Sequence, residues 1–85
     1  MTTLLILLQV ANVAIYSNVA AVVGSAAIVF GASWGIAKIA STALESMARQ
    51  PEAAGDIRSS MVVAAALIEG VSFFAVIVCA LVILL

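Results

Sequence analysis

Charged and metal-binding side chains are scarce in this chain of 85 residues. Only 8% of the residues are charged, histidine is absent, and cysteine and proline occur once each. With no histidine and a lone cysteine, the sequence predicts neither a metal site nor a bound cofactor. The formal net charge is −1 and there is no basic cluster, so nucleic-acid binding is not expected. Hydrophobic residues make up 67% of the chain, which is typical of a membrane protein.

The few charges are concentrated in one segment. Residues 1–37 carry no charge, and five of the seven charged residues lie between Glu45 and Arg58. Within this segment Pro51 disfavours a continuous helix but suits the first turn of a new one, where Glu52 complements the helix N-terminus. The sequence therefore predicts an all-α membrane protein of one domain. It is a hairpin with a first helix over about residues 12–48, a polar turn at 49–51 and a second helix over about 52–85.

The ends of the predicted hairpin differ in charge. Both helices are longer than the roughly 30 Å needed to cross a hydrocarbon core. Lys38, Arg49 and Arg58 all flank the turn, so the positive-inside rule predicts a cytoplasmic turn and outward-facing termini. Residues 1–11 lack the positive start of a signal peptide, and we expect them to form an apolar extension of the first helix.

Glu69 is the one acidic or basic residue between Arg58 and the C-terminus. A charged group at the bilayer centre costs about 2.5–3.5 kcal/mol on insertion scales, so an intramembrane acid indicates a functional site, most often for carrying a proton or an ion. Glu69 follows Pro51 by eighteen residues, a rise of about 27 Å that places it near the middle of the bilayer. Lys38 is nearer the turn, and we expect it to extend towards the surface rather than pair with Glu69.

Small residues alternate along the first helix at the depth predicted for Glu69. Gly31 and Gly35 narrow one side of the helix, and Ser33, Ala37 and Ser41 narrow another. A helix narrowed on two sides is able to pack between two identical neighbours, as a closed ring of copies requires. Around the acid we expect close packing from five residues: Gly31, Gly35, Ile36, Gly70 and Phe73.

Together these features resemble the c subunit of F-type ATP synthases, the proteolipid of the rotor ring. The resemblance covers about residue 31 to the C-terminus. It rests on the small-residue alternation, on the eighteen-residue offset, and on two segments: Ala48-Arg49-Gln50-Pro51-Glu52-Ala53 and Ala66-Leu67-Ile68-Glu69.

The resemblance implies a ring of identical hairpins in a bacterial plasma membrane, with first helices inside and second helices outside. Glu69 would carry the proton, react with carbodiimides and meet an essential arginine of the stator a subunit. Arg49, Gln50 and Pro51 would contact the gamma and epsilon subunits of the central stalk. The protein would be non-catalytic and surrounded by membrane lipid.

The resemblance also bears on which ion is carried. Sodium-using relatives place a glutamine, a serine and a tyrosine where this chain has Ile36, Gly70 and Phe74. Because a sodium ion needs several oxygen ligands, we expect H⁺ as the transported ion. Three alternatives remain at this stage: a proteolipid of a vacuolar-type enzyme, a structural membrane hairpin without transport, and a pore-forming hairpin.

Overall fold

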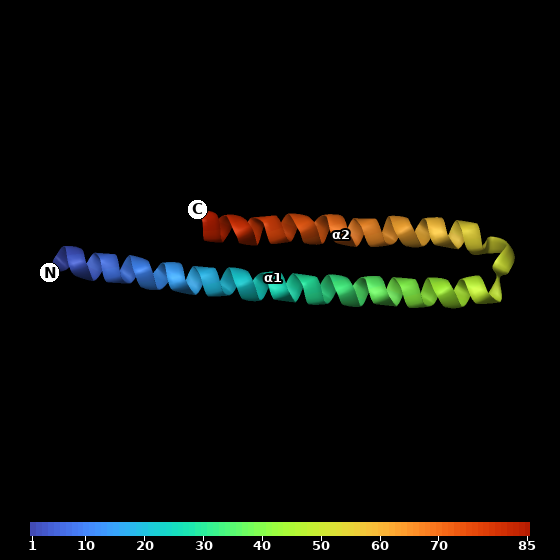
Figure 1. Cartoon of the computed structure of the whole chain (residues 1–85), viewed down its shortest axis with the longest axis horizontal. Coiled ribbons are helices and arrows are strands. Elements are labelled where there is room, and N and C mark those ends of the chain that lie inside the picture. The colour runs from blue at the N-terminus through green and yellow to red at the C-terminus, as the bar shows by residue number, and fades with distance from the viewer.

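The computed structural model describes all residues, Met1–Leu85, as a helical hairpin. It consists of α1 (Thr2–Arg49), the short 3-10 helix η1 (Pro51–Ala53) and α2 (Ala54–Leu84). The two long helices run antiparallel and side by side, joined at one closed end (Figure 1). The Cα positions extend over 75 × 16 × 8 Å. The predicted fold class, an all-α hairpin of two long apolar helices, is confirmed.

The first helix includes the apolar extension at residues 1–11. It begins at Thr2, since no proline or glycine precedes Gly24 to interrupt it. The apolar extension is thus continuous with α1, and Figure 1 shows it reaching past the C-terminal end of α2. Every residue from Met1 to Tyr16 is exposed, so this part of α1 has no partner within the chain.

Gln50 breaks the helix at the closed end. Its φ of −131° and ψ of 71° are not helical, as expected for a residue that precedes proline. Its backbone N–H still donates to the Ser46 carbonyl, and its carbonyl accepts from the Ala53 N–H, both at 2.9 Å. Pro51 then occupies the first position of η1, where its missing N–H costs no hydrogen bond. The turn is therefore short and hydrogen-bonded on both sides.

The residues of α1 that face α2 recur every eleven positions. On α1 the partly or fully buried positions include the series 17–28–39, 21–32–43 and 24–35–46. The same spacing occurs on α2, in the series 57–68–79, 61–72 and 64–75. Eleven residues are only slightly more than three helical turns, so the contact line stays close to one face along the length of the pair. This repeat keeps the two helices in contact from the closed end almost to the C-terminus.

Small side chains bring the two helices close together. Ala21 and Ala43, on the α2-facing side of α1, are the buried residues of the hairpin. A Cβ atom added at Gly35 would lie 3.3 Å from the Cδ1 atom of Ile68, and one at Gly24 would lie 3.5 Å from the Sγ atom of Cys79. The free thiol of Cys79 thus packs at the helix contact. No larger residue fits at Gly35 without moving Ile68.

Most of the apolar surface is left uncovered by the hairpin itself. Val71, Phe73 and Phe30 are 72%, 69% and 68% exposed. Both helices are long and apolar enough to cross a membrane, with mean hydropathies of 1.9 and 2.7. Exposed apolar surface on this scale requires lipid or other chains to cover it.

Candidate functional site

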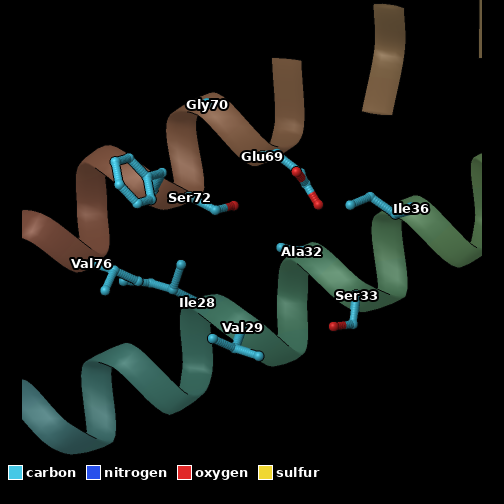
Figure 2. A pocket seen from close by; sticks show the side chains of 10 residues that line it. Ile28, Val29, Ala32, Ser33, Ile36, Glu69, Gly70, Ser72 and Val76 are labelled. Atoms are coloured by element: carbon cyan, nitrogen blue, oxygen red, sulfur yellow. The ribbon is translucent and has the colours of Figure 1, made fainter. Parts of the chain in front are cut away.

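Glu69 lies on one flank of the hairpin, at a groove between the two helices. The groove has a volume of about 560 Å³ and is lined by Ile28, Val29, Ala32, Ser33, Ile36, Glu69, Gly70, Ser72, Phe73 and Val76. In Figure 2 the Glu69 side chain leaves α2 and points towards Ile36 and Ala32 of α1. The carboxylate is therefore directed at the helix contact but remains open to the side of the hairpin. We call this side the Glu69 flank.

A second groove on the same flank continues towards the closed end. Its volume is about 350 Å³, and Ile36 and Glu69 belong to both grooves. The other side chains that line the second groove are apolar: Ile39, Ala40, Met61, Val62, Ala65 and Ala66. Glu69 is thus the single ionisable group in the two grooves, whose other side chains are almost all apolar. In such surroundings the protonation state of the carboxyl decides whether it tolerates lipid.

Two serines supply the other polar groups of the first groove. The Ser72 hydroxyl donates to the carbonyl of Ile68 at 2.7 Å, so its hydrogen is used within α2. Ser33 lies on α1 and is exposed. The sequence analysis did not single out Ser72, although its spacing of three residues from Glu69 places both on neighbouring turns of one helix face.

The structure separates the residues that were expected around the acid. Ile36, Gly70 and Phe73 line the groove of Glu69, and Gly35 lies close to Ile68 of α2. Gly31 instead lies on the opposite flank, in a groove of about 500 Å³ that it shares with Leu67 and Val71. The reason is helical geometry, because positions two apart, such as Gly31 and Ser33, point to opposite sides. Gly31 therefore does not flank the acid within one chain.

The turn residues form a second, separate group. Arg49 ends α1, Gln50 is the break, and Pro51 begins η1. All three are exposed at the closed end, well away from Glu69 along α2. They present a charged side chain and an amide at the tip of an apolar hairpin, which suits contact with a water-exposed protein.

Comparison with known proteins places this geometry in a family. The family model for the ATP synthase c subunit matches residues 19–82. The chain is 53% identical over 78 residues to the ATP synthase c subunit of Phocaeicola vulgatus, covering 92% of this chain and 93% of the relative. It is also 53% identical over 78 residues to the ATP synthase c subunit of Bacteroides thetaiotaomicron, covering 91% and 92%. No solved structure matches the chain.

A hairpin of two membrane-length apolar helices with one acid between them is the architecture of a membrane proteolipid. The chain belongs to the ATP synthase c-subunit family. It is accordingly an integral membrane protein, and the resemblance seen in its sequence is confirmed.

Proposed function

We propose that this chain is the proton-carrying c subunit in the membrane sector, Fo, of an F-type ATP synthase. The observation that carries the proposal is the position of Glu69, the one ionisable group lining the two grooves on its flank of the hairpin. Identical copies form a ring, with α1 inside and α2 outside. The chain itself catalyses no covalent step, since its part is to hold one proton and to move with the ring.

The mechanism follows from the cost of charge in lipid. A protonated Glu69 is neutral and able to face the bilayer, whereas the ionised form is costly there. An arginine of the stator a subunit stabilises the ionised form while the proton leaves, and a new proton then restores the neutral form. Because the neutral form is the one that passes through lipid, the copies advance in one direction under a proton gradient and turn the central stalk.

The family also suggests the location and orientation of the protein. The matched relatives are bacterial, and we place the chain in the bacterial plasma membrane. The three basic residues, Lys38, Arg49 and Arg58, lie within about twelve residues of the turn that closes the hairpin, so that end faces the cytoplasm. There it meets the gamma and epsilon subunits of the stalk.

We expect the transported ion to be H⁺, and sodium competition tests this. The three positions where sodium-using relatives carry ligands hold Ile36, Gly70 and Phe74 here, none of which offers a side-chain oxygen. Apart from Glu69, the groove supplies only the hydroxyls of Ser33 and Ser72, while Na⁺ requires several oxygen ligands. Sodium ions at neutral pH should therefore leave the rate of carbodiimide labelling of Glu69 in the purified oligomer unchanged. Labelling followed by mass spectrometry measures this rate, with potassium as the control salt. Protection by sodium alone would show that the site binds Na⁺.

The closed end offers a separate test of the proposed stalk contact. Arg49→Glu reverses the charge at the tip of the hairpin, where the residue is exposed. We expect this substitution to reduce retention of the water-soluble ATPase sector on membranes several-fold, while Glu69 still reacts with carbodiimide. Membrane-bound ATPase activity after a low-salt wash measures retention. Full retention with Arg49→Glu would exclude Arg49 from the contact.

A further inference from the structure

The two flanks of α2 carry opposite charges near the closed end of the hairpin. Arg58 precedes Glu69 by eleven residues, which is three helical turns with a remainder of about 20°. Arg58 therefore lies on the Glu69 flank. Its side chain is exposed, and it is the one charged residue of α2 on that flank besides Glu69.

Asp56 lies on the other flank. It precedes Leu67 by the same eleven residues, and Leu67 lines the groove opposite Glu69. Asp56 itself lines a groove of about 420 Å³ with Thr42 and Ser60 on this side. Because Asp56 and Arg58 are two residues apart, they point in nearly opposite directions from one helix. We call this second side the Leu67 flank.

We propose that Arg58 of one copy forms an ion pair with Asp56 of the next copy in the ring. This inference takes one element from the proposed function, namely that identical copies form a closed ring. In a closed ring every contact is head-to-tail, so the Glu69 flank of one copy meets the Leu67 flank of its neighbour. The guanidinium and the carboxylate then face each other with a difference in height of about 3 Å along α2, within the reach of an arginine side chain.

The other acids of the charged segment fit Arg58 less well. Glu45 lies on α1, and Glu52 lies in η1 before α2 begins. Only Asp56 is on α2, on the flank that a neighbour presents, and at nearly the same height. The planar guanidinium of Arg58 is able to donate two parallel hydrogen bonds to one carboxylate, which fixes the geometry of such a pair. The pair would fix the height of each copy against the next and hold all Glu69 carboxyls at one level.

Charge exchange tests the pair directly. Arg58→Asp alone and Asp56→Arg alone each place like charges across every contact, and we expect each to lower the yield of detergent-resistant oligomer several-fold. The double variant Arg58→Asp/Asp56→Arg should restore the yield. The matched control, Arg58→Asp/Glu52→Arg, has the same net charge and should not. About 1 M salt, with a screening length near 3 Å, should reduce the differences. Failure of the exchanged pair to restore the yield would overturn the proposal.

Cross-linking in mixed oligomers provides a second measurement that does not depend on assembly yield. Chains with Arg58→Cys and chains with Asp56→Cys, both in a Cys79→Ser background, are co-expressed and treated with a short bismaleimide. We expect the mixed cross-linked dimer, with one Arg58→Cys chain and one Asp56→Cys chain, to form in about tenfold greater yield than either cross-linked dimer of two identical chains. Intact oligomers whose Glu69 reacts with carbodiimide but which lack the mixed product would refute the pair and leave the proposed function standing. Absence of any oligomer would refute both.

Discussion

Replacing Glu69 with glutamine is expected to abolish proton-driven ATP synthesis and leave the hairpin in the membrane. The amide is nearly the same size and fills the same place in the groove that Ile36 and Phe73 also line, but it does not carry an exchangeable carboxyl proton. A neutral side chain also costs less in lipid than a charge, so insertion of α2 should be at least as efficient. ATP synthesis by membrane vesicles under an imposed proton gradient measures the effect.

The same substitution separates transport from a purely structural role. A scaffold would retain its function with Glu69→Gln, because the shape and packing of the hairpin are unchanged. Glu69→Asp is the matched control, since it keeps the carboxyl but withdraws it by one methylene group, and we expect reduced but measurable synthesis. Carbodiimide should label the Asp variant and not the Gln variant. Unaltered ATP synthesis with Glu69→Gln would remove the proton-carrying role.

Introducing leucine at Gly35 is expected to push the two helices apart and to make the oligomer less stable. A single Cβ atom at Gly35 already lies 3.3 Å from the Cδ1 atom of Ile68, and leucine adds three further carbons. Overpacking of a close contact typically costs about 1–3 kcal/mol, with backbone displacement. Since each copy in a ring packs on two others, a small change in helix separation is repeated at every contact. Thermal dissociation of the purified oligomer measures the loss.

A compensating variant and a matched glycine test the reason for this effect. Gly35→Leu combined with Ile68→Ala removes the carbon atoms that the leucine would meet and should recover part of the thermal stability. Gly55 has no atom within 4 Å of an added Cβ, so Gly55→Leu should leave stability close to that of the natural chain. Equal loss of stability at both glycines would indicate that helix approach at Gly35 is not the cause.

The break between the helices was predictable because proline constrains the backbone locally. Residues 1–11 were expected to extend the first helix, but the sequence marks no boundary between the extension and the rest, because no interruption precedes Gly24 and the apolar pattern is uniform. The position of Glu69 along α2 was predictable from a count of residues. The grouping around it was only partly predictable: Ile36, Gly70 and Phe73 line its groove, whereas Gly31 lies on the opposite flank.

By itself the sequence determined that this chain is a membrane hairpin with one acid at depth, and it indicated the family. Those conclusions depend on composition, on one proline and on one carboxylate, and the physics behind each is local. Only the tertiary structure decided which faces of the helices meet. That choice follows from the eleven-residue repeat of small and apolar side chains on both helices, since a face is buried only when its partner matches it along the whole contact. The same choice sets Glu69 and Arg58 on one flank and Leu67 and Asp56 on the other.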